Sequence, residues 1–337
     1  MKKLALLATA LAMVSGSALA ADMRVKAVKA PPPVAFDPWD FAFGSALMSD
    51  YIFRGVTQSN HQPSVSAYFE PRYNVTKDLQ LYIGAAGESI SFTNRAAAEI
   101  DIYGGIRPTF GAFAFDFGVW GYLYPGGQCI ESFGGPIANP LVCPAGSNFV
   151  MPNFNGMKKN VSFFEVYGKV NYTINDNWQF GLNEYYSPNF LNSGAWGNYT
   201  SITGKYTAPS TTFGASGVGL YVSGEFGRQW LGTSDSFYGT NIVSPLGGGP
   251  FPNGVKYADY NTWNIGIGFT YKVFTLDLRY SDTNLSKADC NVFTSDYTAK
   301  LTGAFTSTNP GGASSNWCGA AGIAKFSADL TAMTNLK

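Results

Sequence analysis

Apolar and polar residues alternate along most of the chain beyond residue 40. Between Trp263 and Tyr271, apolar or aromatic residues occupy every odd position, and Asn, Gly and Thr occupy the even positions. From Phe274 to Tyr280 the even positions are apolar, and only residues 272–273 separate the two segments. A period of two is typical of a β-strand with one apolar face, and the short connection predicts an antiparallel hairpin.

The same period predicts an all-β fold of about twelve strands. We expect them at 41–54, 63–75, 79–92, 98–109, 113–124, 161–173, 178–190, 198–208, 214–230, 258–272, 274–284 and 321–333. The alternation is interrupted near Glu184, in the pair 178–190 and 198–208. Most of the segments reach the roughly 9–11 residues that a tilted membrane-spanning strand needs.

The lengths of the connections decide between a barrel and a soluble β-sandwich. Short turns, at 76–78, 110–112, 174–177, 209–213 and 273, alternate with longer segments at 55–62, 93–97, 125–160, 191–197, 231–257 and 285–320. All short turns therefore lie at one end. This asymmetry is typical of outer-membrane barrels, which have short periplasmic turns and long extracellular loops. The sequence predicts a closed antiparallel transmembrane β-barrel.

Aromatic residues are expected at the two membrane interfaces, where amphipathic rings form girdles. They fall near the ends of the predicted strands, at Tyr51, Phe53, Tyr73, Phe110, Phe113, Tyr172, Trp178, Tyr260, Trp263, Tyr271, Phe274 and Tyr280.

The first twenty residues have the features of a cleaved signal peptide. Lys2 and Lys3 precede an apolar stretch, and small residues lead to Ala20. We therefore divide the chain into a signal peptide (1–20), a Pro-rich periplasmic lead-in (21–40) and the barrel (41–337). The predicted location is the outer membrane of a Gram-negative bacterium.

Composition agrees with a membrane barrel and does not point to nucleic acid. Charged residues make up 13% of the chain and aromatic residues 16%, and the formal net charge is zero. A soluble domain carries about twice that charged fraction. A neutral chain gives no electrostatic basis for binding nucleic acid, so the expected partners are outer-membrane lipid and small solutes or ions.

Four cysteines lie in two of the long loops. An even number in an exported chain predicts disulfides, and Cys129–Cys143 and Cys290–Cys318 are the favoured pairs because each closes one loop. No CxxC motif occurs and His61 is the only histidine, so we expect no metal site and no cofactor.

Charged residues within the strands alternate to the face opposite the apolar one. On the lipid face, an Arg or Lys at mid-membrane would cost about 2–4 kcal/mol, so these side chains are expected to point into the lumen as pore-lining candidates. They are Glu70, Arg72, Glu88, Asp101, Arg107, Asp116, Glu165, Lys169, Lys205, Glu225, Asp277 and Arg279, with Lys325 and Asp329 on the last strand. Two interpretations remain open: the charges line a narrow pore, or they form salt bridges that fill a sealed barrel.

The segment that ends the first predicted strand resembles the TorF-type porin family. The motif is Ser-x-Tyr-x-x-Arg-Gly-x-x-x-Ser, formed here by Ser49, Tyr51, Arg54, Gly55 and Ser59, and a Pro-led second strand follows at Pro63. The similarity covers about residues 43–87. It implies an outer-membrane barrel that forms a channel, and it supplies no catalytic residues.

The sequence leaves three classes of function to weigh: a channel, a structural or adhesion-type barrel, and an enzyme. A porin-like channel for passive passage of small solutes or ions is favoured, and a structural or adhesion-type barrel whose loops bind a partner is the alternative. We expect no enzymatic activity, because a Ser-His-acid arrangement needs a histidine beside the nucleophile and His61 lies in a predicted extracellular loop.

Overall fold

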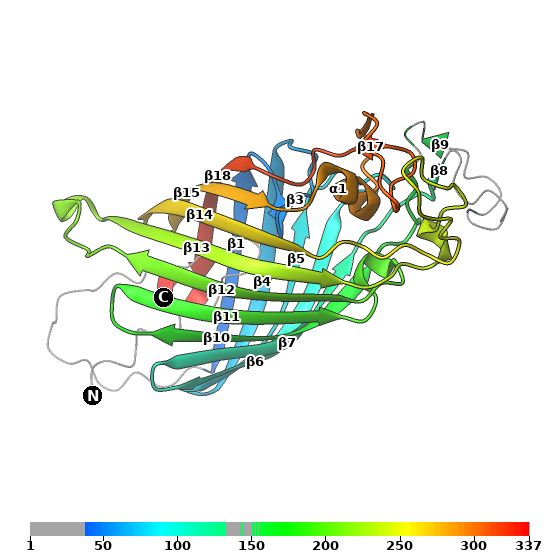
Figure 1. The fold of residues 1–337 in the computed structure, drawn as a ribbon. Helices are drawn as coiled ribbons and strands as arrows, with labels where there is room; N and C mark the ends of the chain where they lie inside the picture. Colours follow the sequence, from blue (N-terminus) through cyan, green and yellow to red (C-terminus); the bar gives the residue numbers. More distant parts are fainter. Residues whose placement is uncertain (1–37, 133–142, 144–149, 152, 154, 337) are drawn as a thin grey trace, which may run out of the picture.

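The computed structural model describes residues 38–132, 143, 150, 151, 153 and 155–336. Twelve strands pair into one closed barrel (Figure 1). They are β1 (Trp39–Met48), β4 (Ser64–Thr76), β5 (Leu79–Glu88), β6 (Glu99–Phe110), β7 (Phe113–Leu123), β10 (Phe163–Thr173), β11 (Trp178–Ser187), β12 (Gly197–Thr207), β13 (Val218–Leu231), β14 (Tyr260–Tyr271), β15 (Phe274–Thr283) and β18 (Ala321–Thr331). Successive strands pair antiparallel, and β1 pairs with β18 to close the wall. The predicted fold class is confirmed.

The remaining elements belong to the connections and the chain end. They are the short strands β2 (Ile52–Phe53), β3 (Val56–Thr57), β8 (Glu131–Ser132), β9 (Val150–Met151), β16 (Lys300–Leu301) and β17 (Ala313–Ser314), the 3₁₀ turns η1 (Phe190–Asn192), η2 (Gly214–Ser216) and η3 (Ser236–Tyr238), and the helices α1 (Lys287–Thr294) and α2 (Ala332–Asn335). Neither helix in the described part of the chain is long and apolar enough to cross a membrane.

Several strand boundaries differ from the prediction, and those of β1 and β5 bear on the interior of the barrel. The strand expected at 41–54 ends at Met48, because the chain then turns into the lumen and forms the separate pair β2–β3. Its start is earlier than expected: Trp39 and Asp40, assigned to the lead-in, pair with β4 as part of β1. The strand expected at 79–92 ends at Glu88. The predicted signal peptide and the rest of the lead-in lie outside the described residues.

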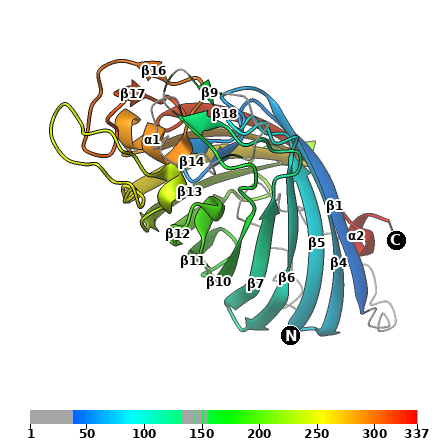
Figure 2. The same ribbon diagram turned by 90° about the vertical axis from the view of Figure 1, so that its right-hand side faces the viewer.

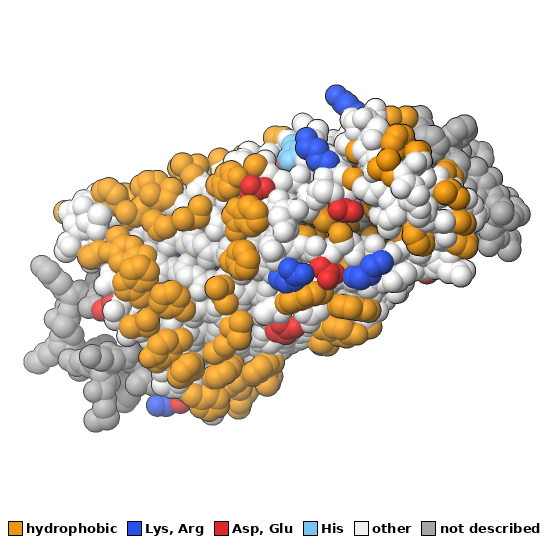
Figure 3. Space-filling view, in the orientation of Figure 1, with side chains coloured by type: hydrophobic (Ala, Val, Ile, Leu, Met, Phe, Trp, Pro, Cys, Tyr) orange, Lys and Arg blue, Asp and Glu red, His pale blue; other side chains and the backbone are white. Residues whose placement is uncertain are grey.

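Because of the alternation in the sequence, apolar side chains cover the outer surface of the barrel and mostly polar or tyrosine side chains face its interior. On β11, for example, Trp178, Phe180 and Leu182 are exposed, whereas Asn183 and Tyr185 are buried. Figure 3 shows hydrophobic side chains over most of the outer strand surface, with few charged groups among them. Such a closed wall satisfies its backbone hydrogen bonds internally and presents apolar side chains outward, as a membrane-spanning barrel requires.

Aromatic residues form a girdle at the end with the short turns. Seven of the predicted positions are exposed there: Tyr73, Phe110, Phe113, Tyr172, Trp178, Tyr271 and Phe274. Three others are not girdle residues. Tyr51 and Tyr260 are buried and Phe53 is half-buried, because all three face the interior.

The long connections gather at the other end, where they make a core of their own (Figures 1 and 2). Buried residues from six of these connections, among them Phe92, Val161, Phe190 and Trp317, form one cluster with residues at the strand ends. Both predicted disulfides, Cys129–Cys143 and Cys290–Cys318, are present. The loops therefore form a packed layer over the outer end of the barrel.

Candidate functional site: the lumen and its inward hairpin

The segment from Ser49 to Gln62, here called the inward hairpin, crosses the lumen near its outer end. Arg54 and Gly55 connect β2 to β3 in a two-residue turn, with φ values of 48° and 78°. Positive φ at both central positions is the geometry that tight hairpins favour. A Cβ atom on Gly55 would lie 2.7 Å from Thr262 Oγ1 of β14, so the turn is pressed against the barrel wall. Glycine is required there for both reasons.

Arg54 anchors the tip of the hairpin to the opposite wall. Its Nη1 and Nη2 donate to the two carboxylate oxygens of Glu165 on β10, at 2.8 and 2.7 Å, and Nη1 also donates to Gln229 on β13 at 3.0 Å. The guanidinium lies 4.4 Å from the ring centroid of Tyr199 and 5.0 Å from that of Tyr185. Glu165 and Gln229 are fully buried, so this two-point ion pair is held away from water.

Asp50 organises the base of the hairpin. Thr57 donates to its Oδ1 at 2.6 Å, and Ser59 Oγ lies 3.0 Å from the same oxygen. The ring of His61 contacts Asp50 Oδ2 through Nδ1 at 2.7 Å. This hydrogen bond to Asp50 raises the pKa of His61 above its usual value of 6.5. Ser59 and His61 both bind Asp50, so they do not stand in the Ser-His order of a catalytic relay.

The hairpin is also tied to the last long loop. Thr57 N donates to the carbonyl of Trp317 at 2.9 Å, and the indole of Trp317 donates to Asn60 at 2.8 Å. Val56 forms a β-bridge with Cys318, which is disulfide-bonded to Cys290. The loop that carries this disulfide therefore holds the hairpin in the lumen from above.

On one wall below the hairpin, charged side chains form a connected network. Glu70 accepts from Arg107 at 2.7 and 3.1 Å and from Arg72 at 2.6 Å. Arg107 also donates to Asp116 at 3.4 Å, and Asp116 accepts from Tyr82 at 2.5 Å. The ring of Tyr82 lies 3.6 Å from the Arg107 guanidinium carbon.

A second network lies on the facing wall. Arg279 donates to Asp277 at 3.0 Å and to Ser223 at 2.8 Å, and Tyr221 donates to Asp277 at 2.7 Å. Glu225 accepts from Tyr199 at 3.0 Å. Charges of both signs thus line both sides of the lumen.

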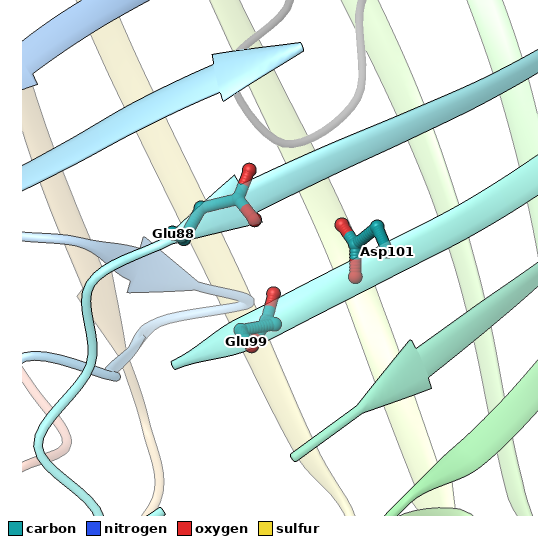
Figure 4. A group of neighbouring side chains, drawn as sticks. All are labelled: Glu88, Glu99 and Asp101. Carbon is teal, nitrogen blue, oxygen red and sulfur yellow. The ribbon is translucent and has the colours of Figure 1, made fainter. Parts of the chain in front are cut away.

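A third group has carboxylates alone. Glu88 and Glu99 are direct cross-strand partners on β5 and β6, and Asp101 follows two residues along β6. Figure 4 shows their carboxylates turned toward a common space. One oxygen from each lies within 4.8 Å of one oxygen from each of the others. Glu99 accepts from Tyr51 of the hairpin at 2.7 Å and from Tyr124 at 2.9 Å.

The pore-lining candidates named from the sequence all alternate to the inner face of the barrel. These are Glu70, Arg72, Glu88, Asp101, Arg107, Asp116, Glu165, Lys169, Lys205, Glu225, Asp277 and Arg279. The sequence interpretation missed Glu99, although it shares the face of Asp101 on the same strand. It also missed the inward position of Arg54, and it placed residues 55–62 in an ordinary extracellular loop. That placement is corrected, because these residues contact the inner wall and the last loop rather than projecting outward.

Every residue of the motif at 49–59 has a structural role. Ser49 closes the seam between β1 and β18 through Ala324, whose N–H donates to Ser49 Oγ at 3.0 Å. Tyr51 and Arg54 reach Glu99 and Glu165, Gly55 forms the turn, and Ser59 accepts from Tyr51 N at 3.0 Å. The motif therefore encodes the inward hairpin.

Residues 34–133 match the model of a family described as a bacterial protein of unknown function (Gcw_chp). The match includes the inward hairpin and the first five long strands of the barrel. The resemblance to TorF-type porins is not confirmed by it. The chain has no significant match among curated protein sequences.

Several solved structures are similar over most of the chain. An outer-membrane channel from Pseudomonas putida F1 is 10% identical, over 90% of this chain and 100% of that one, with a TM-score of 0.43. LpxR from Salmonella typhimurium is 10% identical, over 86% and 99%, with a TM-score of 0.38. A loop-deleted OmpT, an outer membrane protein of Vibrio cholerae, is 12% identical, over 87% and 98%, with a TM-score of 0.34. Each score is below 0.5, so the fold assignment rests on the strand pairing of this chain.

Proposed function

We propose that the protein is a narrow outer-membrane channel for small solutes or ions, constricted by the inward hairpin. One observation carries the proposal: the hairpin is fixed across the lumen by the ion pair of Arg54 with Glu165, above walls that carry charges of both signs. A polar anchor in a lumen lined with charges is typical of the constriction of a channel, where fixed groups select among permeating ions.

The strand number agrees with a narrow passage. Barrels of about eight strands are nearly filled by their own side chains, whereas those of sixteen to eighteen leave a wide aqueous channel. Twelve strands lie between these limits. Buried tyrosine rings and paired charges also project into the interior, so we expect the pathway to pass only small species.

A non-conducting barrel is the second candidate, and the packed loop layer favours it. The long connections bury aromatic side chains against one another and offer a shaped surface at the outer end. A partner would then be bound outside, and the lumen network would serve stability alone.

Conductance in planar bilayers separates the two candidates. We expect small, discrete current steps from wild type, and several-fold larger steps when Arg54→Ala and Glu165→Gln together release the hairpin tip. The neutral pair avoids leaving a buried charge without its partner. Arg228→Ala is the matched control, because Arg228 lies on the outer face beside Asn261 and should leave conductance unchanged. No current from either wild type or the double variant would exclude the channel.

A further inference from the structure

Three carboxylates share one buried space at the outer end of β5 and β6. Glu99 and Asp101 are only 2% and 3% exposed, and Glu88 is partly buried. Glu88 lies directly opposite Glu99 in the strand pairing. Like charges directly opposite each other destabilise a sheet, and burial in a medium of low dielectric strengthens their repulsion. Protonation or a bound cation relieves such a repulsion.

Hydrogen bonding within the described residues satisfies only part of this group. Glu99 has its two tyrosine donors, Tyr51 and Tyr124. By contrast, Glu88 Oε2 and Asp101 Oδ1 are buried and make no hydrogen bond within the described residues, and the neighbouring indole N–H of Trp120, which interacts with Asp101, is also left without a hydrogen bond. Buried polar atoms are nearly always paired, so two orphaned carboxylate oxygens at one point indicate a ligand that accepts their lone pairs.

The charge of the cluster indicates what that ligand is. Lys325 of β18 interacts electrostatically with Glu88, but also with Asp329 and Asp277, so it offsets the charge of the three carboxylates only in part. A divalent cation among the three carboxylates would supply two further positive charges.

The spacing is compatible with calcium. Calcium binds carboxylate oxygens at about 2.3–2.6 Å, so two ligand oxygens on opposite sides of it lie up to about 4.6–5.2 Å apart. One oxygen from each carboxylate lies within 4.8 Å of the other two, a spacing that one calcium ion can span. Magnesium binds at about 2.0–2.1 Å and demands near-ideal octahedral geometry, which fits a strand-borne triad less well.

We propose that Glu88, Glu99 and Asp101 form a binding site for one Ca²⁺ ion in the lumen. Tyr51 and Tyr124 are positioning residues, since they orient Glu99 by donating to its carboxylate. The expectation of no metal site rested on Cys and His alone, whereas these ligands are carboxylates that strand pairing brings together. Tyr51 belongs to the inward hairpin, so the bound ion stabilises the hairpin in its place.

Titration of the purified full-length protein with CaCl₂ alone, after removal of metals by EDTA, tests the site. Calorimetry should show one site per chain, and the thermal unfolding midpoint should rise with Ca²⁺ and fall again with EDTA. Tb³⁺ in the same site should luminesce when Trp120 and the two tyrosines are excited. No calcium binding by wild type would overturn the proposal, whether or not the protein conducts.

Two variants locate the site. Asp101→Asn, and Glu88→Gln at the partly exposed position, should each weaken Ca²⁺ binding at least tenfold. Glu225→Gln is the matched control, because Glu225 also faces the lumen but is bonded to Tyr199 and Asn264 outside the cluster. An equal effect of all three substitutions, or none, would mean that the metal binds elsewhere.

Discussion

Glu70 is the central carboxylate of the charged network below the inward hairpin. It accepts hydrogen bonds from both Arg72 and Arg107, so its own negative charge is doubly compensated. Removing the arginines would expose a fixed negative charge within a narrow, poorly screened space. Selectivity in such a space follows the sign of the nearest fixed charges.

Replacing Arg72 and Arg107 together by Gln should therefore shift the reversal potential toward cations. The measurement is the reversal potential in a salt gradient across a planar bilayer. Lys77→Gln is the control, because Lys77 lies exposed in a short turn and outside the lumen. If the double variant keeps both the reversal potential and the conductance of wild type, the arginines stabilise the wall and do not line the path.

His61 should make stability depend on pH. The pKa of His61 is raised in the folded state by its hydrogen bond to Asp50, so protonation stabilises the fold. This contribution is complete below the unfolded pKa of about 6.5 and is lost as the pH rises through the higher folded value. The urea midpoint of wild type should exceed that of His61→Asn at pH 5.5, and the difference should shrink by pH 8.5. A difference that is constant with pH would contradict this assignment.

At the scale of single elements, the period-two pattern predicted the long strands well because burial on one side sets it. The pattern failed at residues 49–54 for a physical reason. Tyr51 and Phe53 continue the alternation of β1, but they pack inside the barrel instead of facing lipid. Alternation predicts that one face of a segment is apolar. It does not predict whether that face contacts lipid or a packed interior.

The membrane-facing side of β14 gives a test at this scale. Ile267 is exposed within the strand, and Tyr271 is exposed at its end beside a short turn. Ile267→Arg should lower the free energy of unfolding in lipid vesicles by about 2–4 kcal/mol, and Tyr271→Arg by no more than about 1 kcal/mol, because the cost of an arginine depends on depth. Equal effects at the two positions would argue against a bilayer around this surface.

For the molecule as a whole, the sequence predicted the barrel, the sorted loops and both disulfides, but not that the loops pack together. Contacts such as Thr57 with Trp317 join segments more than 250 residues apart. Nothing in local periodicity encodes such a contact. The carboxylate cluster was not predicted, because it depends on the exact register that places Glu88 opposite Glu99.

Replacing Cys290 and Cys318 together by Ser should loosen the hold on the inward hairpin. A disulfide of this kind contributes about 2–4 kcal/mol, so the unfolding midpoint should fall and the loop at 285–320 should become sensitive to protease. Conductance should also increase, because Val56 bridges directly to Cys318. The paired replacement of Cys129 and Cys143 is the comparison, since that disulfide closes a different loop. Unchanged protease resistance and conductance in the first variant would show that packing alone retains the loop.

In the orientation that we propose, the packed loop layer is the part of the protein that other molecules can bind from outside the cell. Its exposed face combines segments from several loops that are distant in sequence and held together by a shared core. An antibody or bacteriophage that attaches there would recognise a conformational epitope rather than a linear peptide. Reduction of the two disulfides would abolish such recognition while the strands beneath remained in the membrane, and synthetic loop peptides would make poor immunogens.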